Sequence, residues 1–511
     1  MNRGLNKIKT ISGLAEIKNI HPNQTIVHCH GVFDVLHAGH LAYFESAKSF
    51  GNILIVTLTT DKYVNKGPGR PYYSENIRAR MIAALEVVDY VAVNTTATAE
   101  AAIEAIRPDF YVKGPDYKDL SKDVTGGIYR EQVAVEKVGG QLVFTDDATM
   151  SSSTLINKFF TSWSEDQTKV IDAVKAIGGI DAVNEALDKM AKLNIRIIGE
   201  PIVDTYIFCA PENISSKNPC ISAKYMYEEN YAGGSLAIAN HLSDFCNSVE
   251  IMFTCGDEPY FQKLLKDKMD SRVKVTRHNI KNVPTPRKTR YLAIDSSQRM
   301  FEITDLRHDQ WKHHPTEIFC KEIAKSNSSN SIDAHIIADF GHGLFENEVL
   351  QTVEKINGFV ALNVQTNSSN FGFNPFTKHK KFSYLCIDTR EARVAYHDRY
   401  TTAIDLAKII HKDLKQLSSV SITLGSNGSY YFPKDCIEES ASPAFSDKVV
   451  DATGAGDAYF AMSSLLVKIN APEILVPFMG NIFAGLKTKI IGNKNSVSRA
   501  EFIKAIHAIL K

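Results

Sequence analysis

Two histidines three residues apart follow a short apolar run that ends at Cys29. They are His37 and His40, and Gly31 and Gly39 stand beside them. A helix that begins here presents free amide groups and the positive end of its dipole to an anion. Glycines let the backbone approach a phosphate, and the histidines can donate hydrogen bonds to oxygens that gain charge during displacement at phosphorus. The segment predicts phosphate-transfer chemistry; the plainer interpretation is a capped helix start.

A second turn of this kind lies near the end of the chain. Gly454, Ala455 and Gly456 precede Asp457 and a helical run. Amides at such a helix start can bind an anion, and the aspartate can accept a proton from a hydroxyl that attacks a phosphate. Phosphoryl transfer needs mainly positioning and charge stabilisation, with one base to orient the nucleophile. The alternative is a glycine-rich turn with an acidic residue in the first helical turn.

Apolar runs and helical patterns alternate along the first 160 residues, and they must position the histidines. Strands are expected at 25–29, 53–58, 90–93, 110–112 and 142–144, and helices at 41–50, 77–85 and 99–106. Alternation with short connections predicts a parallel sheet covered by helices on both faces.

The rest of the chain repeats this alternation after a helical stretch. Residues 163–193 have helical periodicity, broken by Gly178-Gly179. Strands are expected at 195–199, 249–253, 335–338, 359–362 and 420–424. The predicted organisation is a first domain at 1–160, a helical connector at 161–193 and a second domain at 194–511. In both domains we expect ligands beyond the carboxyl ends of the strands.

The composition excludes several classes of protein. The 511 residues carry 58 basic and 58 acidic side chains and are 44% hydrophobic, which rules out collagen-like, disulfide-scaffold and wholly disordered chains. Charge neutrality disfavours a nucleic-acid partner. The eight cysteines form no C-x-x-C pair, and no apolar run reaches the ~18–20 residues that span a bilayer. We expect a cytoplasmic protein without a membrane partner.

The string G-x-F-D-x-x-H-x-G-H from Gly31 to His40 resembles the signature of the cytidylyltransferase-like nucleotidyltransferases, and the likeness covers residues 25–160. It implies a Rossmann-like fold in which His37, His40 and Lys48 serve catalysis. The nucleotide-binding residues it implies are Gly31, Phe33, Gly39, Lys113, Ser152, Ser153 and Thr154. The substrate-binding residues it implies are Asp34, Arg70 and Arg80. The segment that begins Val112-Lys113-Gly114 resembles the K-G-x-D-Y form of the heptose-type adenylyltransferases.

The string D-x-T-G-A-G-D at 451–457 resembles the ribokinase-like sugar kinases, with supporting matches over 195–505. This likeness implies a ribokinase-like α/β domain with a small β lid, in which Asp457 is the catalytic base. Nucleotide and phosphate would be bound by Glu391, Thr423, Gly425, Gly428, Gly454, Ala455 and Gly456. The sugar would be bound by Asp204, Gly233, Gly234, Lys288 and Arg290.

The second domain departs from the kinase pattern at four places. Ala237 replaces an asparagine, His342 a lysine, Asn363-Val364-Gln365 a D-P-K string, and Asp388 an asparagine. The kinase therefore either accepts a different sugar or has weak or lost activity, and we favour the first. We also expect the basic run 378–381, with His379, to be a solvated loop.

Together the halves resemble the bifunctional enzymes of ADP-heptose biosynthesis, with the order of the domains reversed. The likeness implies ATP-dependent phosphorylation of a heptose-like sugar phosphate, followed by nucleotidyl transfer, for surface glycan assembly. Mg²⁺ is expected, without a residue assigned as its direct ligand, and the chain is expected to form a homodimer. One alternative is a CTP-dependent cytidylyltransferase for a polyol or other phosphate, with a degenerate kinase-like domain. In another, the second half only binds sugar or dimerises and regulates the first.

Overall fold

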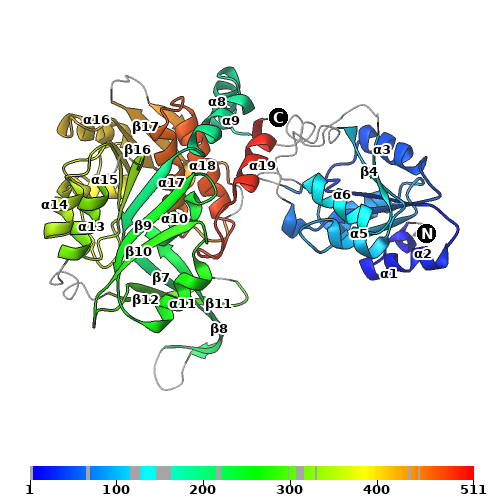
Figure 1. Cartoon of the computed structure of the whole chain (residues 1–511), viewed down its shortest axis with the longest axis horizontal. Helices are drawn as coiled ribbons and strands as arrows, with labels where there is room; N and C mark the ends of the chain where they lie inside the picture. The colour runs from blue at the N-terminus through cyan, green and yellow to red at the C-terminus, as the bar shows by residue number, and fades with distance from the viewer. Residues whose placement is uncertain are drawn as a thin grey trace. The chain divides into compact units, whose positions relative to one another are not determined.

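The computed structural model describes residues 4–64, 70–115, 127–145, 163–214, 220–296, 298–306, 316–327, 331–434, 439–446 and 449–510. The chain divides into two compact units, one made of Met1–Trp163 with Ile503–Lys511 and the other of Ser164–Phe502 (Figure 1). The predicted phosphate-binding residues 152–154 lie outside the described residues.

The first unit contains a five-stranded sheet in the order β3-β2-β1-β4-β5, and all neighbouring strands are parallel. Its strands are β1 Ile26–Gly31, β2 Ile53–Thr59, β3 Tyr90–Asn94, β4 Phe110–Lys113 and β5 Gln141–Phe144. Its helices are α1 Ile11–Ala15, α2 Ile17–Ile20, α3 Ala38–Lys48, α4 Glu75–Ala83, α5 Glu100–Ile106 and α6 Gly127–Lys137. The predicted strands and helices are all present, and the expected Rossmann-like α/β fold is confirmed.

Both faces of this sheet are buried, as the continuous apolar runs predict for parallel strands. Side chains of α3 and α4, such as Phe44 and Ile82, pack against Val27 and Val56 on one face. On the other face, residues of α1 and α5 pack against Ile26 and Ile55. The sheet is therefore a rigid support for the loops that leave its carboxyl edge.

The second unit is built on a nine-stranded sheet in the order β10-β9-β6-β13-β14-β15-β16-β17-β18, in which the last two strands run antiparallel to their neighbours. Its strands are β6 Asn194–Gly199, β9 Ser248–Cys255, β10 Val273–Asn279, β13 Ala334–Asp339, β14 Phe359–Val364, β15 Tyr384–Asp388, β16 Ser419–Thr423, β17 Ser429–Pro433 and β18 Ser440–Ser442. The five strands predicted for this part of the chain are among them.

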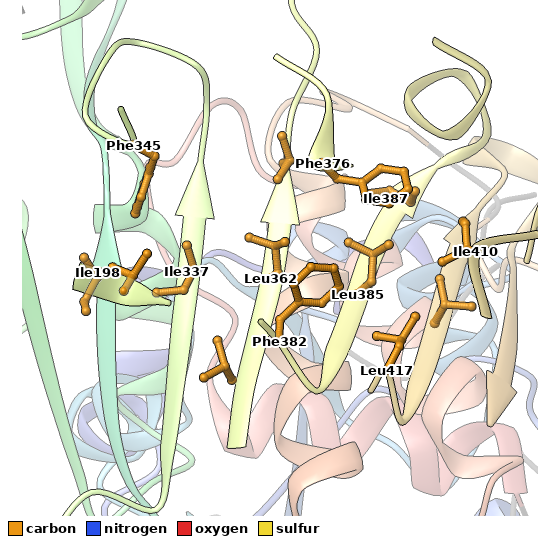
Figure 2. Packing of buried hydrophobic residues seen from close by; sticks show 14 of the residues in the cluster. Ile198, Ile337, Phe345, Leu362, Phe376, Phe382, Leu385, Ile387, Ile410 and Leu417 are labelled. Carbon is orange, nitrogen blue, oxygen red and sulfur yellow. The ribbon is translucent and has the colours of Figure 1, made fainter. Parts of the chain in front are cut away.

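Helices cover both faces of the large sheet. One face packs on α13 Glu317–Asn327, α14 Asn347–Val353, α15 Thr389–Ala395 and α16 Ala403–Asp413. Figure 2 shows this core, where Ile337, Leu362 and Leu385 of adjacent strands lie in one buried layer. The helices that contact the strands from the other face include α10 Ser235–Leu242 and α17 Ala455–Lys468, and α18 Leu475–Lys487 packs on α17.

A separate four-stranded sheet in the order β12-β11-β7-β8 forms the lid of this unit. Its strands are β7 Pro201–Ile214, β8 Ile221–Gly234, β11 Arg287–Ala293 and β12 Arg299–Asp305. The expected ribokinase-like fold with a small β lid is confirmed. The helical stretch 163–193 forms α8 Glu165–Ala176 and α9 Ile180–Met190, which contact β18 and α17 of the second unit. The remaining described helices are α11 Pro259–Lys268 and α19 Arg499–Leu510, and none in the described part of the chain is long and apolar enough to cross a membrane.

Candidate functional site

The first candidate site lies where the order of the five-stranded sheet reverses. β1 has β2 on one side and β4 on the other, so the connections after β1 and β4 run to opposite sides of the carboxyl edge, which is where open α/β sheets bind ligands. His37 and His40 follow β1, while Lys113 is the last residue of β4. The fold therefore brings these three predicted residues to one edge of the sheet.

His37 is the residue that begins α3. Its backbone is extended, and its Nδ1 accepts a hydrogen bond from the Gly39 amide at 3.1 Å. Since Nδ1 acts as the acceptor, the neutral ring carries its proton on Nε2. Burial lowers the pKa of His37, and its ring stacks on that of His40 with centroids 4.0 Å apart. The site thus offers a neutral imidazole with a donor at Nε2, oriented by the helix start.

Gly31 and Phe33 form the support beneath the histidines. Phe33 has a φ of 50°, and its buried ring lies against Gly31, where a Cβ atom would come within 2.9 Å of Phe33 Cζ. The same ring contacts His40 edge-on at 5.4 Å. In the structure these two predicted nucleotide-binding residues shape the backbone under His40.

Asp34, in the segment between β1 and α3, forms hydrogen bonds with the loop before α4. Its buried carboxylate accepts hydrogen bonds from the amides of Tyr72 and Tyr73 at 2.7 and 3.0 Å. The guanidinium of Arg70 lies 3.7 Å from the same carboxylate, and its side chain is 3% exposed. Asp34 and Arg70, both predicted to bind substrate, are thus brought together as a buried ion pair.

Arg78, rather than the predicted Arg80, is the arginine of α4 that faces this loop. Arg78 is fully buried and donates to the carbonyls of Val32, Thr59 and Tyr73 at 2.5, 2.9 and 3.0 Å. Arg80 lies exposed on the other side of the helix. Two residues on a helix are rotated by about 200°, so the two arginines cannot share a face. Arg80 therefore does not share the buried contacts of Arg78, and its assignment to the substrate site stays a prediction.

Lys48 lies at the opposite end of α3 from the histidines. Its ammonium pairs with Asp89 and donates to the carbonyl of Asn52 at 2.5 Å. Eight residues of helix separate it from His40, which amounts to about 12 Å at 1.5 Å per residue. The structure does not bring Lys48 to the histidines, so we leave it out of the transferase site.

A buried polar layer that the sequence analysis missed lies under the β1–β2 edge. The Thr57 hydroxyl bonds His28 Nε2 at 2.7 Å and His30 Nδ1 at 2.8 Å. Burial and the nearby charge of Lys113 lower the pKa of His30 to about 3. Lys113 itself is buried and pairs with Glu131 of α6 at 2.8 Å. Alternation along β1 places both histidines on one face, which was the available signal.

The second candidate site lies at the start of α17. Asp457 is buried in the first helical turn, and Gln365 Nε2, just after β14, donates to its Oδ1 at 2.5 Å. Burial raises the pKa of Asp457 to about 6; the charge of Asp204 also raises it, while Gln365 and two lysines oppose the shift. The turn before it has Gly454 at φ 77° as N-cap. The Ala455 amide donates to the carbonyl of Ala452 at 3.2 Å, and the Gly456 amide lies in the first turn, where helical acceptors are missing.

The predicted sugar-binding residues gather on the lid side of Asp457. Asp204 is buried, pairs with Arg290 at 2.5 Å and accepts a hydrogen bond from Asn493 at 3.2 Å. Gly233 is required beside it, because a Cβ there would lie 2.1 Å from Asp204 Oδ2. Lys288 shares β11 with Arg290; burial lowers its pKa, although the charges of Asp204 and Asp457 act in the opposite direction.

Gly234 completes this side of the site. Its φ is 60°, it is the N-cap of α10, and a Cβ there would come within 2.7 Å of the carbonyl of Glu200. The substituted position Ala237 lies buried in the same helix. The glycine pair therefore serves the close turn from β8 into α10.

The predicted nucleotide side lies at the ends of β15 and β16. Thr423 ends β16, opposite Asp388 of β15, and Gly425 and Gly428 follow it with φ of 61° and 93°. Glu391 and Asp388 form a capping box at the start of α15. Burial and the charge of Asp388 raise the pKa of Glu391 to about 8. The aspartate that replaces asparagine at 388 is thus used as a helix cap.

The prediction of a solvated loop at 378–381 is wrong for Lys378 and His379, while Lys380 and Lys381 are exposed. Lys378 and His379 both contact the buried carboxylate of Asp339 at the end of β13, at 2.7 and 2.8 Å. His379 is 3% exposed. His342, in the turn after Asp339, is also buried, and its amide donates to Glu200 at 2.9 Å. These residues fix the turn that follows β13.

No group of three or more metal-ligating side chains occurs among the residues that the structure describes. Glu391, the carboxylate expected on the phosphate side, accepts hydrogen bonds from the amides of Asp388 and Thr366. The donor set fits a cation that is carried mainly by the phosphates of a nucleotide, since Mg²⁺ usually keeps waters and needs few protein ligands.

Comparison with known proteins agrees with both folds. Residues 28–159 match the cytidylyltransferase-like family, and residues 197–468, more than half of the chain, match the pfkB family carbohydrate kinases. A crystal structure from Agrobacterium tumefaciens, described as a ribokinase, aligns with 62% of this chain and 98% of its own, with a TM-score of 0.50 and 14% identity. At this identity the likeness concerns the fold alone.

Curated relatives share a shorter stretch. The Bifunctional protein HldE of Helicobacter pylori (strain G27) is 43% identical over 121 residues, 23% of this chain and 26% of that protein. The Bifunctional protein HldE of Methylobacillus flagellatus is 41% identical over 149 residues, 28% of this chain and 29% of that protein. These alignments span little more than a quarter of each relative. The chain belongs to the pfkB family of carbohydrate kinases and also carries a cytidylyltransferase-like domain.

Proposed function

We propose that the chain is a bifunctional enzyme that makes a nucleotide-activated sugar. Its second unit phosphorylates the anomeric hydroxyl of a heptose-like sugar phosphate with ATP. Its first unit transfers a nucleotidyl group from a nucleoside triphosphate, ATP in our reading, to the resulting sugar 1-phosphate and releases pyrophosphate. The names of the curated relatives support the pairing of two activities.

The observation that carries the kinase half is the environment of Asp457. A base with a pKa of about 6 is largely ionised at neutral pH and still close enough to neutrality to exchange a proton efficiently. Gln365 occupies Oδ1, which leaves the other carboxylate oxygen to accept the proton of the attacking hydroxyl. The oxygen then bonds to the γ-phosphorus and ADP leaves, while the amides at the start of α17 stabilise the phosphoryl oxygens.

The departures from the kinase pattern support activity on a different sugar rather than loss of activity. Gln365 stands in the altered D-P-K string and is the residue that holds the base. Asp388, another altered position, keeps Glu391 in place through the capping box. The changes therefore alter contacts around the site and leave the base and the helix start intact.

The transferase half is supported by the stacked pair of His37 and His40 at the carboxyl edge of the sheet. An oxygen of the sugar 1-phosphate attacks the α-phosphorus, and pyrophosphate leaves. His37 Nε2 is the ring nitrogen that does not take part in the cap bond, and it can donate to an oxygen that gains charge in this step. Lys113, beside the same edge, is the candidate contact to the nucleotide. Bound with the triphosphate, Mg²⁺ would neutralise phosphate charge and stabilise the leaving pyrophosphate.

The test measures the two half-reactions separately. The full chain is incubated with MgATP and a panel of heptose and hexose phosphates, and ADP is measured; sugar 1-phosphates with ATP or CTP are then assayed for pyrophosphate. We expect ADP release with a heptose phosphate and pyrophosphate release with ATP. Pyrophosphate only with CTP would replace the adenylyl assignment by a cytidylyl one, and the absence of ADP with every acceptor would favour a regulatory role for the second unit.

We also propose that the chain forms a homodimer through its lid. The outer strands β8 and β12 expose large apolar side chains, which are Ile221, Tyr225, Met226, Tyr227, Phe301 and Ile303. Exposed large apolar side chains at both edges of one sheet favour an interaction surface there. Light scattering should give twice the chain mass, and Phe301→Glu with Ile303→Glu should give the monomer. A monomeric wild-type chain would contradict this proposal.

A further inference from the structure

Lys487, the last residue of α18, is buried completely. Its Nζ donates hydrogen bonds to two main-chain carbonyls, that of Thr453 at 2.8 Å and that of Gly492 at 2.6 Å. Burying an ammonium group is costly unless its hydrogen bonds and charge are compensated. A lysine kept in this position calls for a reason beyond packing.

The carbonyl of Thr453 belongs to the turn that leads into α17. Gly454, the N-cap, has a φ of 77°, and a Cβ there would lie 3.4 Å from Lys487 Cε and 2.9 Å from Asn493 Oδ1. The lysine thus packs directly against the backbone that precedes the catalytic aspartate. A displacement of Lys487 would be transmitted to this turn first.

Peptide geometry links that carbonyl to the phosphate side of the turn. In a planar trans peptide the C=O and N–H groups point in opposite directions. When Lys487 holds the carbonyl of Thr453, the amide of Gly454 in the same peptide points away from the lysine. An ammonium at the carbonyl also polarises the peptide, which strengthens the amide as a donor.

The carboxylates around Lys487 favour a positive charge on its side chain. Burial lowers the pKa of Lys487, while the carboxylates of Asp451, Asp457 and Asp204 favour its charged form. Asp451 accepts hydrogen bonds from the amides of Thr453 and Gly492, the two residues whose carbonyls bind the lysine. The ammonium therefore closes a bridge between the turn at 453–454 and the segment after α18.

We propose that Lys487 is a positioning residue, a tethered monovalent cation that holds the anion-binding turn of the kinase in its active conformation. Carbonyl oxygens can replace the hydration shell of a small cation, as they do in ion-selective pores. The lysine takes that place permanently, so the turn is formed without a dissolved cation. The inference rests on the kinase half of the proposed function.

The experiment compares the wild-type chain with Lys487→Met and Lys487→Gln. Lys412→Met is the control, since Lys412 is exposed at the end of α16. Each protein is assayed for sugar-phosphate phosphorylation and, by calorimetry, for MgADP affinity. The salts are potassium, ammonium and N-methylglucamine chloride at equal ionic strength. MgADP binding needs no sugar, so it tests the lysine even where no acceptor in the panel is phosphorylated.

We expect the wild type and Lys412→Met to behave alike in all three salts. Both Lys487 variants should lose about 100-fold in kinase rate in N-methylglucamine, the scale of one lost oxyanion donor. Potassium or ammonium should restore at least part of the rate and of the MgADP affinity, because these ions fit the vacated position. The Gln variant keeps an amide donor at this position, so it can be assayed if the Met variant does not fold.

Three results would overturn the proposal. The first is a wild-type chain whose kinase or MgADP binding requires potassium. The second is a folded Lys487 variant with unchanged activity in N-methylglucamine. The third is a loss of kinase rate and of MgADP affinity in the Lys487 variants that is equal in all three salts, because a dissolved ion would not replace a purely structural lysine. Failure of both variants to give soluble protein in every salt has the same meaning.

Discussion

The two candidate sites use different chemical groups. After β1 there are two stacked histidines, and burial lowers the pKa of His37. At the start of α17 there is the carboxylate of Asp457, and burial raises its pKa to about 6. Burial favours the neutral form in both places. For a histidine this preserves a hydrogen-bond donor without charge; for an aspartate it produces a base that titrates near neutrality. The same physical effect thus prepares one site for stabilising charge and the other for taking up a proton.

The largest effect is expected from Asp457→Asn. The amide keeps the size of the side chain but cannot accept the proton, so the kinase rate should fall by about 10²- to 10⁴-fold. Pyrophosphate release by the first unit should be unchanged. Asp166→Asn is the control, because Asp166 is exposed in the first turn of α8. An undiminished kinase rate would remove Asp457 from the mechanism.

The matching change in the first unit is His37→Asn. Asparagine can still cap α3 but has no group in the place of Nε2–H, so nucleotidyl transfer should fall by about 10²- to 10³-fold with little loss of stability. Kinase activity should be retained. His397→Asn is the control, since His397 is exposed and has a φ of 51°, which asparagine tolerates. Loss of both activities would mean that the two sites are not separable.

Arg78→Met tests the support of the transferase site. Removing the guanidinium leaves three carbonyls without their donor, so the free energy of unfolding of the first unit should fall by about 2–4 kcal/mol. Arg80→Met, two residues away and exposed, should change it by less than about 0.5 kcal/mol. Urea unfolding of the full chain, followed by a probe in the first unit, measures both. Equal effects would show that Arg80 also has a role in this loop.

Gln365→Leu tests whether the titration of Asp457 controls the pH dependence of kinase activity. Kinase activity should rise with pH through about 6 as Asp457 loses its proton. Without the hydrogen bond from Gln365 that favours the carboxylate, the pKa should rise further and this acid limb should move up by about one pH unit. Nucleotidyl transfer should have the same pH profile in both proteins, because Gln365 belongs to the second unit. An unmoved limb would assign the titration to another group.

Apolar periodicity predicted the five strands of the first unit and five strands of the large sheet, because it is a local property. The β lid was implied only by the resemblance to the ribokinase-like kinases. The run 53–58 and the helical pattern of 77–85 correspond directly to β2 and α4. The motifs at 31–40 and 451–457 also indicated the two candidate sites, since each motif occupies a single turn between a strand or loop and a helix.

Residue roles outside these turns were harder to predict. Lys48 and Arg80 were assigned by their spacing from a motif, which does not tell which end or face of a helix carries the side chain. Gln365 and Lys487 come from segments about 90 and 30 residues from Asp457. The tertiary fold brings Gln365 to its carboxylate and Lys487 to the carbonyl of Thr453 in the turn before it. His379 was misread because a basic run is usually solvated, and only its buried partner Asp339 shows otherwise.

The most direct test mixes the two inactive variants in the complete two-step conversion. With a kinase rate lower by about 10²- to 10⁴-fold, Asp457→Asn should release little ADP and form little nucleotide sugar during the assay. His37→Asn should accumulate the sugar 1-phosphate. Equal amounts of both, supplied with the heptose phosphate and MgATP, should restore the nucleotide sugar because the intermediate passes between molecules. Undiminished formation of the nucleotide sugar by Asp457→Asn alone, or no product from the mixture, would contradict two separate phosphate-transfer sites in one chain.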